Sequence, residues 1–128
     1  MEYPSEDVRR QLEEMRYDTE EDCARNLAHL AELIGKQPNI SPESDPFESL
    51  TAIEGWASLA SYVVARTYAP QSPFRYPGWT HHVGRLLRRI ATQLRSELLK
   101  IAQFLGATGC SVGVSFPWGL SVSLDWTV

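Results

Sequence analysis

Residues 110–126 read CSVGVSFPWGLSVSLDW, and this stretch decides the fold class. Apolar residues alternate with small polar ones on both sides of a central Pro-Trp-Gly, the pattern of two strands with one buried face. The three-residue connection ends in glycine, which predicts a β-hairpin over about residues 110–127 with Gly119 in the left-handed region. The expected pairs on the apolar face are Phe116 with Leu120, Val114 with Val122, Val112 with Leu124, and Cys110 with Trp126.

The other face of this hairpin is small and polar, and residues 110–124 carry no charge. A two-stranded sheet alone is marginal in water, so we expect its apolar face to lie on helices. Natural edge strands are usually protected by lysine, proline or a bulge, and here only Pro117 in the connection does so. We therefore expect the hairpin to pair or stack with a second copy or with a partner chain. The surface offered is Ser111, Gly113, Ser115, Ser121 and Ser123. The alternative is a lid over the helices, with edges shielded by the acidic linker before residue 46.

Upstream of the hairpin, apolar residues recur at steps of three and four. This spacing predicts helices over about residues 5–34, 46–68 and 80–105. The chain therefore predicts an α+β fold, an antiparallel bundle of three to four helices followed by a C-terminal β-hairpin. The length of 128 residues predicts one domain over residues 1–128.

The ends of these helices carry recognisable signals. Ser5 is a candidate N-cap, and Asp45 before a proline is another. The stripe weakens after residue 16, where Thr19 and Asp22 form a restart signal, so residues 5–34 fit one bent helix or two. Two glycines are expected to end helices, Gly35 as the C′ residue of the first region and Gly106 as the stop of the last helix. The small residues around Gly55 predict a close approach between helices.

Charge is distributed unevenly along the chain. The formal net charge is −4, which argues against a general nucleic-acid binder. Residues 1–54 hold fourteen acidic and five basic residues, whereas residues 55–128 hold two acidic and seven basic ones. We expect the two halves to attract each other, within one fold or across a dimer. The basic candidates are Arg85, Arg88, Arg89 and Arg95, which are expected to pair with Glu13, Glu14, Glu20 and Glu21 or with acids of a partner.

Export and membrane insertion are not indicated. The first seven residues are acidic and lack the apolar core of a signal peptide. The longest apolar run, residues 56–65, is about half of the roughly 20 residues that a membrane span needs. These features predict a soluble cytoplasmic protein without a membrane partner. Cys23 and Cys110 have no metal-type spacing and are expected to be free thiols, and no motif predicts a cofactor or a metal.

One short motif suggests chemistry. Arg75 precedes His81 by five intervening residues at the start of an expected helix, and His82 follows directly. This spacing resembles the arginine–histidine signature of HEPN-type ribonucleases, which are helical bundles. The resemblance implies that His81 would act in acid–base transfer and that Arg75 would stabilise phosphate charge on RNA.

The sequence therefore favours a small non-enzymatic module for protein–protein interaction, an adaptor or homo-oligomer that uses the uncharged hairpin and the complementary halves. The first alternative is an RNA-binding or HEPN-like ribonuclease bundle that uses Arg75 and His81. The second alternative is an acidic, immunity-like inhibitor of a basic partner.

Overall fold

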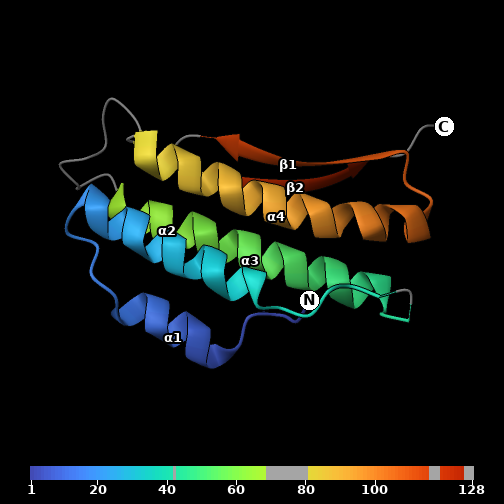
Figure 1. The fold of residues 1–128 in the computed structure, drawn as a ribbon, viewed down its shortest axis with the longest axis horizontal. Coiled ribbons are helices and arrows are strands. Elements are labelled where there is room, and N and C mark those ends of the chain that lie inside the picture. Colours follow the sequence, from blue (N-terminus) through green and yellow to red (C-terminus); the bar gives the residue numbers. More distant parts are fainter. Residues whose placement is uncertain (42, 69–80, 116–118, 126–128) are drawn as a thin grey trace.

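The chain folds into helices followed by a C-terminal antiparallel hairpin (Figure 1), in a computed structural model that describes residues 1–41, 43–68, 81–115 and 119–125. This confirms the α+β expectation. The described elements are α1 (Glu6–Glu14), α2 (Glu20–Gly35), α3 (Pro46–Thr67), α4 (His81–Leu105), β1 (Gly109–Ser115) and β2 (Gly119–Asp125). Across the described helices, no segment combines the length and the hydropathy of a membrane span.

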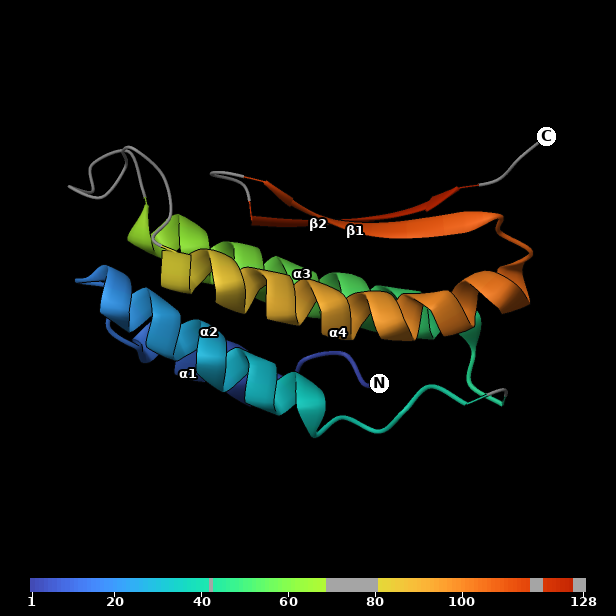
Figure 2. The same cartoon turned by 45° about the horizontal axis from the view of Figure 1, so that its top comes forward.

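The elements are arranged in layers (Figure 2). The hairpin forms one outer layer and lies on α3 and α4, with β1 mainly against α4 and β2 mainly against α3. On the other side, α2 packs against both α4 and α3, and α1 lies at the edge of the molecule opposite the hairpin in the view of Figure 1. The apolar face of the hairpin is therefore covered by the α3–α4 pair, which is the support that a two-stranded sheet requires.

The first helical region is two helices. Ser5 caps α1 by accepting from the Val8 N–H at 3.3 Å. The chain leaves helical geometry at Met15, and Thr19 then starts α2 with a capping box. The Thr19 hydroxyl accepts from the Asp22 N–H at 3.0 Å, while the Asp22 carboxylate accepts from the Thr19 N–H at 3.2 Å. Reciprocal capping stabilises a helix start. Thr19 and Asp22 therefore make residues 5–34 two helices and not one bent helix.

Glycine ends one helix as expected and not the other. Gly106 has φ 69° and follows the last residue of α4. Gly35 does not have a positive φ and lies inside the helix, so its expected position as the C′ residue is wrong. It is the last residue of α2, and the Lys36 N–H satisfies the terminal carbonyls of Glu32 and Leu33 at 3.1 and 3.2 Å. Helix-type bonds therefore complete this end without a left-handed residue.

The register of the hairpin differs from the expected one by two residues. Val114 pairs with Leu120, and Val112 pairs with Val122. Cys110 pairs with Leu124 and not with Trp126. Phe116, the expected partner of Leu120, and Trp126 both lie outside the described residues. A shift of two keeps each side chain on its own face, which is why the expected apolar face is nevertheless confirmed. Gly119 has φ 90°, as expected for the left-handed region.

The N-terminal segment packs on α3. A Cβ atom at Gly55 would lie 2.6 Å from a ring carbon of Tyr3 and 2.9 Å from Cδ of Pro4. The Trp56 indole N–H donates to the Glu2 carbonyl at 2.7 Å. Gly55 thus allows the N-terminal segment to approach, and the expected close approach between helices at this position is wrong.

Candidate functional site

One residue of α3 is bonded to the backbone of the hairpin. The Ser61 hydroxyl accepts from the Leu120 N–H at 3.0 Å. The same hydroxyl can donate its proton to the Leu120 carbonyl or to the Ala57 carbonyl, whose oxygens lie 3.3 Å and 3.1 Å from Ser61 Oγ. Both backbone groups of Leu120 therefore point to α3 and away from β1. In an antiparallel ladder this identifies Leu120 and its partner Val114 as a pair that is not hydrogen-bonded to each other.

This contact fixes the direction of the backbone groups along the hairpin. Pairs alternate between hydrogen-bonded and non-hydrogen-bonded positions, so the residues opposite each other at 112/122 and 110/124 share the geometry of Val114 and Leu120. The N–H and C=O groups of Cys110, Val112 and Val114 consequently point to the outer edge of β1. Within the described part of the chain, nothing hydrogen-bonds to that edge. We call these three residues the β1 edge.

The outer face of the hairpin carries only small, uncharged residues at the positions whose side chains are described. Ser111 and Ser123 are exposed, and their hydroxyl groups lie 2.7 Å apart across the strands. Gly113 and Ser121 are also exposed and form the next cross-strand pair. Ser115 belongs to β1, but its side chain lies outside the described ones. Four of the five residues predicted for this face are thus brought together on one exposed surface.

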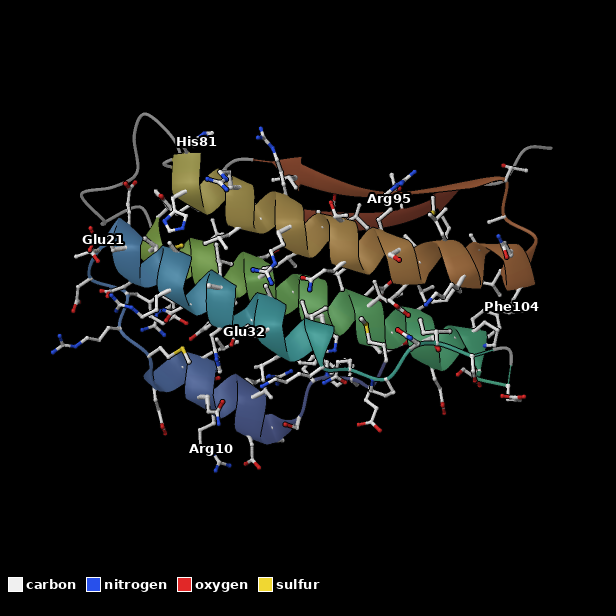
Figure 3. The ribbon with its side chains drawn as sticks, viewed as in Figure 1. Arg10, Glu21, Glu32, His81, Arg95 and Phe104 are labelled. Carbon is white, nitrogen blue, oxygen red and sulfur yellow. The ribbon has the colours of Figure 1, made fainter. Side chains whose placement is uncertain are left out.

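The four predicted arginines of α4 are exposed, but they do not share one direction. The side of α4 that faces α2 is marked by Gln93, whose amide donates to the Ala31 carbonyl at 3.1 Å. Successive helical residues turn by about 100°, so Arg88 and Arg95 lie about 140° and 160° from Gln93, on the side that carries the hairpin. Figure 3 shows Arg95 rising from α4 beside the strands. The other two, Arg85 and Arg89, lie further round the helix, away from the hairpin.

The expected ion pairs between the two halves of the chain are not formed in the described ranges. All the ion pairs found there are local, Asp7–Arg10, Asp22–Arg25 and Glu97–Lys100, each joining residues three positions apart. None of the predicted acids Glu13, Glu14, Glu20 and Glu21 lies within ion-pair distance of an α4 arginine. Glu20 instead accepts from the Tyr68 hydroxyl at 2.9 Å. The charges of Arg88 and Arg95 are therefore not neutralised by a described acidic side chain.

The candidate ribonuclease residues are only partly described. His81 and His82 are exposed at the start of α4, whereas Arg75 lies outside the described residues. The ribonuclease interpretation therefore stays a prediction. No group of three potential metal ligands occurs among the described side chains. His29 is half-buried, and its Nε2 atom has no hydrogen-bond partner in this part of the chain.

Both cysteines are free thiols, as expected. Cys23 is buried in α2, and burial raises the pKa of its thiol from 9.0 to about 11, with a smaller opposing effect from the hydrogen bond to Thr67. Cys110 is partly buried on β1. At neutral pH the buried Cys23 thiol is therefore protonated, which makes it a poor nucleophile.

Two sets of residues were not identified from the sequence. The first is Ser61, which lies 59 positions before Leu120 and gives no local signal of its contact. The second set surrounds Tyr17. The Arg66 guanidinium lies 4.6 Å from the centre of the Tyr17 ring and 5.7 Å from that of Tyr62, and it donates to the Tyr62 hydroxyl at 2.6 Å. Burial raises the pKa of Tyr17 to about 12. This set fastens the α1–α2 connection to α3, which is a structural role.

No family model, curated protein or solved structure matches the chain in comparisons of its sequence and fold. The function must therefore be argued from the geometry of the hairpin and its surroundings.

Proposed function

We propose that the protein is a non-enzymatic interaction module whose C-terminal hairpin binds another chain, either a second copy or a protein partner. The observation that supports this proposal is the β1 edge, where three residues direct backbone donors and acceptors outward without a described partner. Unpaired backbone groups at a sheet edge are a ready template for one more strand.

The support beneath the hairpin favours strand addition. β1 already lies on α4, so the backbone that would accept a further strand is held in place before binding. A preorganised edge loses little conformational freedom on association. The exposed Ser111, Gly113, Ser121 and Ser123 are small, so a neighbouring chain can approach the sheet without steric obstruction.

The experiment separates edge pairing from other contacts. The Val112→Pro variant removes an outward N–H of the β1 edge while the ladder bonds to β2 remain, and Val112→Thr is the matched control that keeps this donor. Size-exclusion light scattering of each full-length chain, from micromolar to millimolar concentration, then reports association. Oligomers of the wild type and of Val112→Thr, with monomeric Val112→Pro, would support pairing of two copies through the edge.

A monomer for all three chains excludes the second copy as the occupant. Binding of a partner is then tested by titrating strand peptides against the edge amides. If no strand peptide of any charge perturbs the amide signals of Val112 and Val114, the proposed function is wrong.

A further inference from the structure

Two uncompensated positive charges lie next to the β1 edge. Arg88 and Arg95 project from α4 on its hairpin side, both are exposed, and neither forms an ion pair with a described residue. Because β1 lies over α4 and β2 lies over α3, the outer edge of β1 is on the side of α4 that is turned away from α3. Around the axis of α4, the two arginines lie between the direction of the sheet and the direction turned away from α3. They therefore border the path that an added strand would take.

The position of Arg95 along this edge follows from the lengths of the two elements. β1 runs back along α4 from its C-terminal end, as Figure 1 shows. A strand rises about 3.3 Å per residue and a helix about 1.5 Å, so one strand residue spans roughly two helical ones. Counting back from Leu105 and Gly109 places Val114 close to the level of Arg95. Arg88 then lies nearer the hairpin connection.

We propose that the β1 edge binds an extended acidic segment of a partner protein, and this inference rests on the proposed function. The segment would add to β1 as a third strand through backbone hydrogen bonds with Cys110, Val112 and Val114. Alternate side chains of a strand point to one face, so acidic residues at every second position would be directed toward α4 and its two arginines. The backbone of the β1 edge would hold the strand by hydrogen bonds, and the two arginines would favour a strand with acidic side chains.

The same charges argue against a second copy on this edge. Symmetric antiparallel pairing of β1 with β1 about Val112 or Val114 would bring the two Arg95 side chains within about 10 Å of each other's level on facing helices. Like charges so placed oppose association, and charged side chains beside an edge are a known means of preventing self-pairing. An acidic strand removes this repulsion and replaces it with attraction.

The test titrates the full-length protein with two blocked octapeptides, one alternating Glu and Thr and the other alternating Lys and Thr. Backbone amide NMR signals of Val112 and Val114 report edge pairing. We expect the Glu–Thr peptide to shift both signals, and we expect the Lys–Thr peptide to bind at least about threefold more weakly. The acidic peptide should also bind less tightly as salt is raised, because exposed charges are screened.

Charge-reversal variants locate the selecting residues. Arg88→Glu and Arg95→Glu should each weaken binding of the Glu–Thr peptide by about threefold or more, and the double variant should favour the Lys–Thr peptide. Arg89→Glu changes the charge equally at a position that points away from the hairpin, and it should weaken binding less than either. Since all three side chains are exposed, folding should be retained, and circular dichroism checks this.

The outcomes separate the inference from the proposed function. Equal binding of both peptides, or equal effects of all three variants, would overturn the acidic partner while leaving strand addition in place. No shift at Val112 and Val114 with either peptide would overturn both. A dimer that Val112→Pro abolishes would show that the edge takes a second copy, which also overturns the acidic partner.

Discussion

The backbone N–H of Leu120 donates to the Ser61 hydroxyl at 3.0 Å, and the Leu120 carbonyl lies 3.3 Å from the same oxygen. One side chain of α3 thus takes the place of a neighbouring strand at the first outward-pointing residue of β2. The β1 edge has no such side chain among the described residues. The two edges of one hairpin therefore differ in their capacity to accept another strand.

Removal of this hydroxyl should loosen β2. We expect Ser61→Ala to lower the free energy of unfolding by about 1–2 kcal/mol, because the Leu120 backbone groups lose their partner. Denaturant unfolding measures the change, and amide exchange at Leu120 should become faster. Ser58→Ala, an exposed position of α3, is the matched control and should change stability little. Equal stability of the two variants would contradict the role of Ser61.

Gly119 should tolerate a side chain worse than Gly106. Both have positive φ, 90° and 69°, so alanine is strained at each. At Gly119 a Cβ atom would also lie 2.8 Å from Cα of Ser61, whereas at Gly106 nothing lies within 4 Å. We expect Gly106→Ala to cost about 1 kcal/mol and Gly119→Ala to cost roughly 2 kcal/mol or more. Thermal unfolding of the two variants tests this order, and a larger loss for Gly106→Ala would refute it.

The capping carboxylate of α2 should stabilise the protein in a pH-dependent way. Burial alone would raise the pKa of Asp22, but hydrogen bonds from Thr19 and Asp18 and the nearby Arg25 outweigh it and lower the pKa below 3.8. The stabilisation is therefore present above pH 3.8 and is lost as the pH falls through the lowered value. Unfolding free energies of wild type and Asp22→Asn should differ at pH 7 and converge in strong acid. A difference that is independent of pH would argue against this assignment.

The thiol of Cys23 should react slowly in the folded chain. With its pKa raised from 9.0 to about 11, the thiolate fraction at pH 8 falls by about a hundredfold. A Cys110→Ala variant leaves Cys23 as the single thiol, and a disulfide reagent at pH 8 then compares the native chain with the chain in denaturant. We expect at least this factor between the two rates. The raised pKa also stabilises the folded state below pH 9, and this contribution is lost as the pH rises through about 11.

Much of the fold follows from local signals. Ser5, Thr19 and Asp45 each mark a helix start, because a capping side chain needs only its own neighbours in sequence. The register of the hairpin could not be predicted in this way. Both candidate registers keep the same apolar face and the same connection length, and the close approach of Gly119 to Ser61 is a long-range contact that alternation does not show.

The residues of the exposed hairpin face could be predicted from the sequence, but the difference between the two edges of the hairpin could not. Alternation identified the exposed serine and glycine face correctly. It could not distinguish the two edges, because the capping hydroxyl of Ser61 comes from a distant helix. The expected pairing of Arg88 and Arg95 with acids of the same chain is not formed in the described ranges, since opposite charge in a sequence does not bring two surfaces together, and their pairing with acids of a partner stays a prediction. The layer order places the hairpin, and not α1, beside these arginines.

The hairpin layer has a thermodynamic consequence. A two-stranded ribbon relies on α3 and α4 for its stability, and a third strand would supply bonds that the ribbon lacks. Anything that binds only the intact ribbon shifts its local opening equilibrium by mass action. Occupancy of the site and resistance of the C-terminal region to proteolysis would then rise together.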